Sequence, residues 1–125
     1  MTERELNELL MGAFPKIRDE LLAYMEEDGD GMDTGCFLTH EDVLHPLIEK
    51  AVDDNDSEGL KRVGDYVEAL LASHDEYAEN VATVGLVEWL ALEHPGEAVR
   101  DALGERGRAL YDGDAATQGR QEHSR

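Results

Sequence analysis

The stretch VATVGLVEWLAL at residues 81–92 constrains the fold of this chain more than any other. It is apolar on nearly every side of a helix, and a helix of that kind belongs in the centre of a protein. Twelve residues are too few to cross a bilayer, which takes about 20, and Glu88 interrupts the run. We therefore expect a buried helix over about 75–93, with amphipathic helices packed around it.

The other apolar residues recur at helical spacing, and no period-two alternation of β-branched residues indicates a strand. Thr39 and Asp42 have the pattern of a capping box that starts a helix, and Pro46 indicates a kink in it or a new helix. The fold class is all-α, with five or six helices in antiparallel hairpins, as a bundle or a short helical-repeat-like stack. The expected helices other than the central one cover about 2–13, 15–27, 39–52, 57–73 and, more weakly, 98–111.

The chain has the size of one domain, since 125 residues with 41% hydrophobic content are enough for a single core. From residue 112 onward the sequence DGDAATQGRQEHSR has no large apolar side chain. A segment without such side chains cannot bury enough surface to offset its ordering entropy. We expect a single helical domain over 1–111 and a disordered tail over 112–125.

The formal charge is −19, with 30 acidic residues against 11 lysines and arginines, and 17 of the acids lie in the first 60 residues. Such a field disfavours nucleic acid and anionic membrane as partners and favours a basic protein. An alternative is that the acidity serves solubility or a salt-adapted host. The candidate partner-binding residues are the acids of two loops: Glu26, Glu27, Asp28, Asp30, Asp33, Asp53, Asp54 and Asp56.

The loop over residues 28–41 is rich in aspartate and glycine, which is typical of a calcium loop. A twelve-residue calcium register from Asp30 supplies oxygens at Thr34 and Glu41, but Met32 occupies the third position, where an oxygen ligand is needed. Calcium binding by this loop therefore remains an alternative, and no metal ligand or cofactor is predicted.

No catalytic residue is predicted. Residues 73–75 read Ser-His-Asp, but consecutive helical side chains point apart, and Cys36 stands beside carboxylates that raise a thiol pKa. An enzyme that uses carboxylates alone is a further alternative. Glu88 interrupts an apolar face, so we expect it to pair with Lys61, Arg62 or a helix end, or to act directly.

The compartment is expected to be the cytoplasm. Cys36 is the single cysteine, so no disulfide framework within the chain is possible. The first residues are acidic and lack the basic and apolar pattern of a secretion signal.

Residues 60–90, LKRVGDYVEALLASHDEYAENVATVGLVEWL, resemble a family of small acidic all-helical bacterial proteins of undefined biochemistry. The matching features are YVEALL, an aspartate-containing connection, Asn80, and VEWL with Glu88 and Trp89. Members of that family often resemble immunity proteins of polymorphic toxin systems. The resemblance implies a non-catalytic domain that binds a cognate protein, so we expect an immunity-type inhibitor that engages a basic toxin through its acidic surface.

Overall fold

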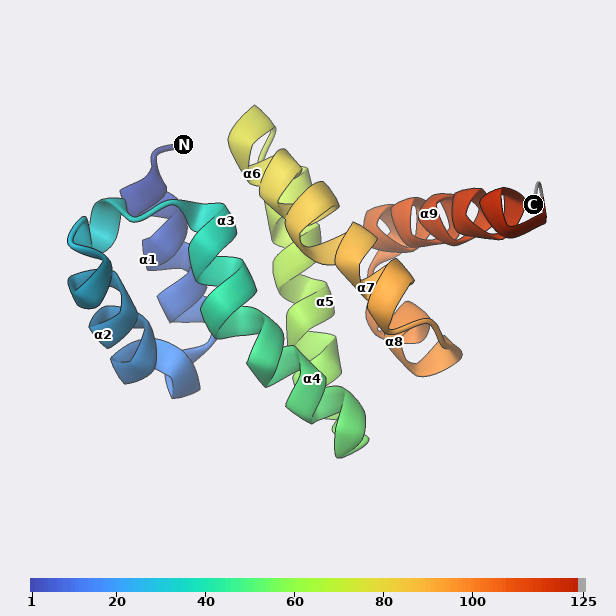
Figure 1. Cartoon of the computed structure of the whole chain (residues 1–125), viewed down its shortest axis with the longest axis horizontal. Helices are drawn as coiled ribbons and strands as arrows, with labels where there is room; N and C mark the ends of the chain where they lie inside the picture. Colours follow the sequence, from blue (N-terminus) through green and yellow to red (C-terminus); the bar gives the residue numbers. More distant parts are fainter. Residues whose placement is uncertain (124–125) are drawn as a thin grey trace.

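The computed structural model describes residues 1–123, and within that range all regular structure is helical, as the sequence predicted. The helices pack around one hydrophobic core, to which all parts of the chain up to Tyr111 contribute. The antiparallel hairpin arrangement stays a prediction. Figure 1 shows α1 (Glu3–Ala13) and α2 (Arg18–Asp28) on one side and α4 (His45–Asp53) and α5 (Ser57–Ala72) in the middle. On the other side lie α7 (Trp89–Glu93), α8 (Glu97–Ala102) and α9 (Glu105–His123). The first elements are α1 (Glu3–Ala13), η1 (Pro15–Ile17), α2 (Arg18–Asp28) and η2 (Gly31–Asp33).

The helix α1 begins where the sequence predicted. The Thr2 side chain accepts a hydrogen bond from the Glu5 amide, and the Glu5 side chain accepts one from the Thr2 amide. This reciprocal pair satisfies two of the backbone donors that a helix N-terminus leaves free. Leu6 and Leu10 of α1 are fully buried, which fixes the face that α1 turns to the core.

The third predicted helix is one continuous helical run made of α3 (Cys36–Thr39), η3 (His40–Leu44) and α4 (His45–Asp53). η3 is a π-helix, which is wider than an α-helix and bonds each amide to the carbonyl five residues back. Pro46 lies just after it, and we attribute the widening to the clash between a proline ring and the carbonyl four residues earlier. The helix therefore passes Pro46 without ending.

The predicted capping box at Thr39 is wrong. The run begins three residues earlier at Cys36, and the Thr39 side chain is fully buried. Its hydroxyl donates to the Asn7 Oδ1 at 2.9 Å or to the Cys36 carbonyl at 3.1 Å. A buried threonine satisfied by tertiary contact shows the same local pattern of residues as a helix cap, so the sequence could not distinguish them.

The helix α5 (Ser57–Ala72) lies in the middle of the molecule (Figure 1). Asp56 caps it by accepting from the Gly59 amide at 3.0 Å. A Cβ atom on Gly64 would lie 1.9 Å from the Ala102 carbonyl oxygen at the end of α8 (Glu97–Ala102). Glycine at this position therefore lets α8 approach α5.

The predicted central helix consists of α6 (Glu76–Asn80), the π-helix η4 (Val81–Glu88) and α7 (Trp89–Glu93). Leu86 and Val87 are fully buried, but Val84 is 52% exposed and Glu88 is exposed. The expectation that Glu88 lies in a buried apolar face is wrong. A spacing of four residues places Glu88 on one face with Val84 and Leu92, and Leu92 is also exposed, at 44%. This partly apolar face therefore turns to solvent rather than to the core.

The chain ends in α9 (Glu105–His123), whose first turns pack against α5, η4 and α7. The later part of α9 projects from the body (Figure 1). The helix thus continues through residues 112–123, within the segment for which the sequence predicted a disordered tail. That tail and the domain boundary at 111 stay predictions, and residues 124 and 125 lie outside the described part. None of the described helices is long and apolar enough to span a membrane.

Candidate functional site

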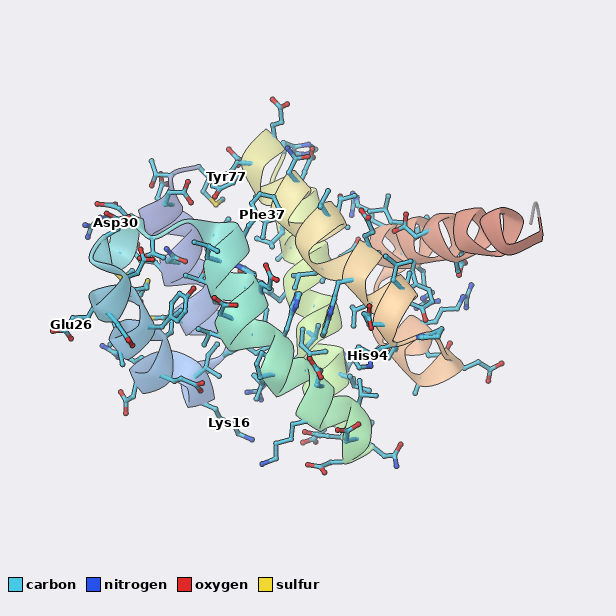
Figure 2. The ribbon with its side chains drawn as sticks, in the orientation of Figure 1. Lys16, Glu26, Asp30, Phe37, Tyr77 and His94 are labelled. Carbon is cyan, nitrogen blue, oxygen red and sulfur yellow. The ribbon has the colours of Figure 1, made fainter. Side chains whose placement is uncertain are left out.

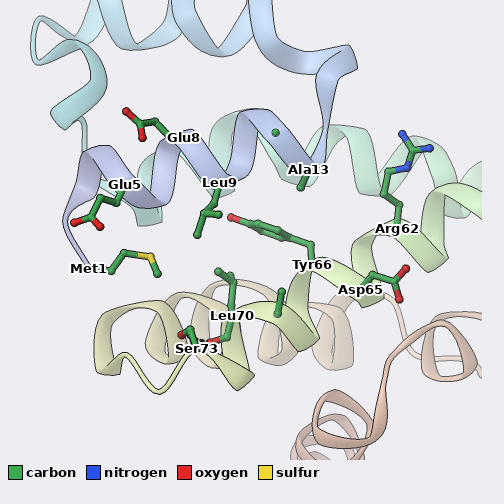
Figure 3. A pocket seen from close by; sticks show the side chains of 12 residues that line it. Met1, Glu5, Glu8, Leu9, Ala13, Arg62, Asp65, Tyr66, Leu70 and Ser73 are labelled. Atoms are coloured by element: carbon green, nitrogen blue, oxygen red, sulfur yellow. Dashed lines mark hydrogen bonds between the residues drawn. The ribbon is translucent and has the colours of Figure 1, made fainter.

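A groove of about 810 Å³ separates α1 from α5. Figure 3 shows Leu9 on α1 and Tyr66 and Leu70 on α5 turned toward one another across it. Leu9 is 47% exposed, although it recurs in sequence with the buried Leu6 and Leu10. Leu9 therefore offers exposed apolar surface to the groove, whereas Tyr66 and Leu70 on the facing wall are buried.

The charges of this groove lie on its edges. Glu5 and Glu8 come from α1, and Arg62 and Asp65 come from α5 (Figure 3). Glu5 is held by the capping box, and Asp65 lies 3.5 Å from the Lys61 ammonium. Three carboxylates against one guanidinium make the rim acidic around an apolar bottom.

Tyr66 connects the groove to a buried polar cluster. Its hydroxyl lies 2.7 Å from the His40 Nε2, and the two rings are stacked with an interplanar angle of 16°. The His40 Nδ1 lies 2.6 Å from the Cys36 carbonyl, so Nδ1 must carry the proton and donate. His40 Nε2 then accepts from the Tyr66 hydroxyl, and every polar atom of the buried ring has a partner.

Burial sets the protonation state of this cluster. Desolvation lowers the pKa of His40 to about 4, and it raises the pKa of Tyr66 above its usual value. Burial and the neighbouring Glu3 raise the pKa of Cys36 to about 12. All three groups are neutral at pH 7, and a protonated thiol agrees with the expectation that Cys36 is a poor nucleophile.

The loop over residues 28–35 is held by Asn7. The Asn7 side-chain amide donates to the Met32 carbonyl at 3.0 Å and to the Thr34 carbonyl at 2.9 Å. The Thr34 hydroxyl donates to the Gly31 carbonyl, and Met32 packs against the core. Asn7 was not predicted as a functional residue from the sequence, where its signal is a polar residue between the core positions Leu6 and Leu10.

This geometry gives the calcium alternative no support. The helix already begins at Cys36, which is the seventh position of the register from Asp30, so Glu41 lies on η3 rather than folding back toward the loop. Among the described residues, no group of three or more histidine, cysteine, aspartate or glutamate side chains is placed to hold a metal ion.

His45 has a different partner from His40. Its Nε2 donates to the Gly85 carbonyl at 2.7 Å, and its ring stacks on Trp89 with centroids 3.6 Å apart. Burial lowers the pKa of His45. The two histidines therefore connect the helical run over residues 36–53 to two different neighbours. His40 bonds to α5, and His45 bonds to η4.

The eight predicted partner-binding acids are all exposed, but they form two separate groups. Figure 2 shows Glu26 and Asp30 near the turn between α2 and η2, whereas in Figure 1 the turn between α4 and α5 lies away from it, at the lower edge of the middle of the molecule. Asp33 pairs with Arg4 of α1 at 3.4 Å, so the first group adjoins α1. Asp56 of the second group caps α5. The first group is Glu26, Glu27, Asp28, Asp30 and Asp33, and the second is Asp53, Asp54 and Asp56.

Taken together, the described residues define an all-α domain with an open interhelical groove above a buried, fully bonded polar cluster. The chain belongs to a family described as a domain of unknown function, DUF7674, whose model matches residues 7–118. No curated protein and no solved structure matches the chain.

Proposed function

We propose that this chain is a non-catalytic protein-binding domain that holds a basic partner in the groove between α1 and α5. The observation that carries the proposal is the combination of exposed apolar surface at Leu9 with an acidic rim of Glu5, Glu8 and Asp65. Grooves between helices commonly accept an amphipathic helix, whose apolar side chains enter the groove and whose polar side chains meet the rim.

The partner's chemistry follows from the groove. An apolar side chain inserted beside Leu9 and Leu70 would supply affinity, because burying one aliphatic side chain is worth about 1.5–3 kcal/mol. Lysine or arginine residues facing the rim would supply orientation and fast association, which the charge of −19 reinforces at low salt. The acidic group 26–33 adjoins α1 through the pair of Asp33 and Arg4, and would add to the negative field that attracts a basic partner.

The specific form that we propose is an immunity-type inhibitor of a bacterial toxin. The resemblance of residues 60–90 to such proteins supports it, and these residues include the α5 wall of the groove. In this form, the domain binds stoichiometrically and covers the active site of a basic toxin. It contributes no catalytic group.

The test is to co-express the full chain with the protein encoded by the adjacent reading frame, and to measure protection and binding. Leu9→Glu places a charge on the bottom of the groove and should weaken binding about tenfold or more. Leu92→Glu is the matched control, because Leu92 is 44% exposed on α7 against 47% for Leu9. Circular dichroism should show that both variants remain folded.

Two results would refute the proposal. If the chain neither co-purifies with the protein encoded by the adjacent reading frame nor protects against it, the proposal of an immunity-type inhibitor is refuted. If the two proteins bind and Leu9→Glu and Leu92→Glu have equal effects, the groove is not the binding site.

A further inference from the structure

A row of aromatic side chains lies where the helical run of α3, η3 and α4 faces η4. The rings of Phe37 and Tyr77 have centroids 6.1 Å apart, and those of His45 and Trp89 are stacked at 3.6 Å. Gly85 connects the two pairs, because a Cβ on it would lie 3.6 Å from the Phe37 ring and its carbonyl accepts from the His45 Nε2 at 2.7 Å. Figure 2 shows Phe37 and Tyr77 beside one another between α3 and α6. We call Phe37, Tyr77, His45 and Trp89 the aromatic row.

Part of the aromatic row is open to solvent. Phe37 is 40% exposed, and Val84, which adjoins Gly85 on η4, is 52% exposed. Tyr77 and Trp89 are partly buried. Single exposed apolar side chains are ordinary, but a contiguous apolar patch with polar residues around it is typical of an interaction site. None of these five residues lines the groove between α1 and α5, so the aromatic row is a separate surface.

The charge around the aromatic row has one sign. Residues 36–49 and 76–94, which carry the row, contain seven carboxylates and no lysine or arginine. Lys50 comes next in α4, but it lines the hollow between η1, α4 and α5. Arg106 and Arg108 belong to α9, which packs on η4, and both are bonded to other parts of the chain. A partner of this surface must therefore be basic if its charge is to complement the row.

Two of these carboxylates lie beside exposed apolar side chains. Glu41 is four residues after Phe37, and Glu88 is four residues after Val84, so each acid shares a side of its helix with one of them. Burial lowers the pKa of His45, and the carboxylate of Glu41 acts against that shift, which places Glu41 near the row. Neither Glu41 nor Glu88 makes an ion pair with any residue that the structure describes. Both carboxylates are therefore available to an external cation.

We propose that the aromatic row binds an arginine-rich peptide segment of a partner protein. A guanidinium is planar, stacks on aromatic faces and can bond a carboxylate through two N–H groups at once. The exposed ring of Phe37 and the carboxylate of Glu41 offer both contacts on one side of the helix. A lysine ammonium is a compact, strongly hydrated charge, so it gains less from the ring. The surface therefore selects arginine over lysine, and this selection does not depend on the groove between α1 and α5.

The experiment is a fluorescence titration of the full chain with an arginine octapeptide and, separately, with a lysine octapeptide of equal charge. Trp89 is the single tryptophan of the chain and belongs to the aromatic row, so its emission reports binding there. We expect saturable changes, with the arginine peptide bound about fivefold more tightly than the lysine peptide. Phe37→Ala should reduce this preference to less than about twofold, because the exposed ring is removed.

Glu41→Gln tests the carboxylate and keeps the shape of the side chain. It should weaken the arginine peptide about threefold, since it removes the charged acceptor beside Phe37. Glu20→Gln is the matched control, because Glu20 is an exposed acid of α2, which lies across the molecule from α7 (Figure 1). It should have less than half that effect. Circular dichroism should show that the variants keep their helical content.

Three results would overturn the proposal. Equal affinity for the two peptides would refute the contact between guanidinium and ring. Equal weakening by Glu41→Gln and Glu20→Gln would show that only the general charge of the chain attracts the peptide. Binding by calorimetry without a change in Trp89 emission would place the peptide elsewhere. If Phe37→Ala does not fold, the wild type with two peptides and the two glutamine variants still decide the outcome.

Discussion

The buried His40 should make this fold sensitive to mild acid. In the folded protein, burial lowers the pKa of His40 to about 4, whereas the ordinary value is 6.5. The unfolded chain therefore binds a proton on His40 as the pH falls below 6.5, while the folded chain does not. The stability that neutral His40 supplies is complete above pH 6.5 and is lost as the pH falls toward 4.

The magnitude follows from the same two values. One pKa unit corresponds to about 1.4 kcal/mol, so the full shift of His40 is worth roughly 3 kcal/mol. Between about pH 7.5 and about pH 5, the free energy of unfolding should fall by about 2 kcal/mol because of His40 alone. Neutralisation of the many carboxylates over the same range changes the stability too, so a difference between variants is needed to isolate His40.

His40→Gln provides that difference. It should cost about 1–3 kcal/mol at neutral pH, because one buried hydrogen-bond partner of the Tyr66 hydroxyl or the Cys36 carbonyl is lost. Urea unfolding followed by circular dichroism at the two pH values should show that the wild type loses about 2 kcal/mol more than the variant.

Tyr66→Phe is the control for this comparison. It removes the hydroxyl that donates to His40 but keeps the ring buried, so burial still lowers the pKa of His40. This variant should lose about 1–3 kcal/mol at both pH values and keep the pH dependence of the wild type. If His40→Gln and the wild type have the same pH dependence, the reasoning about His40 is wrong.

Four further substitutions test the packing. Asn7→Ala should lower the free energy of unfolding by about 3 kcal/mol and increase amide hydrogen exchange in residues 31–35, because several buried polar groups lose their partner. Gly64→Ala should destabilise the fold severely, because the added Cβ meets the Ala102 carbonyl. Gly12→Ala should instead stabilise the fold by up to about 1 kcal/mol, because a Cβ on Gly12 meets no atom within 4 Å and alanine favours the helix. Thermal unfolding measures both effects. Glu88→Ala should change the stability by less than about 0.5 kcal/mol, because Glu88 is exposed.

The all-α class and the order of the helices could be predicted because each helix carries its own periodic apolar positions. The helical runs over residues 36–53 and 76–93 have features that the periodic pattern does not predict. Both contain a π-helix, which a pattern read at 3.6 residues per turn does not indicate. The apolar side chains of Val84 and Leu92 share a face with Glu88, and the sequence could not show that this face is exposed.

The candidate site was harder to predict than the fold. The acidic residues were found from composition, and the structure leaves all eight exposed, but composition could not show that they lie in two groups. The groove between α1 and α5 depends on Leu9, which has the sequence signature of a core residue and is left partly uncovered because α5 stands away from it. Only the relative placement of two helices reveals such a feature.

Arg62 is the one guanidinium among the residues that line the groove between α1 and α5. A basic partner in this groove is repelled by Arg62, so its positive residues should lie at the end formed by Glu5 and Glu8. Arg62→Glu would extend the acidic rim, and we expect it to strengthen binding of a basic partner, most clearly at low salt. Binding that is unchanged or weaker in a direct titration would mean that Arg62 does not orient the partner.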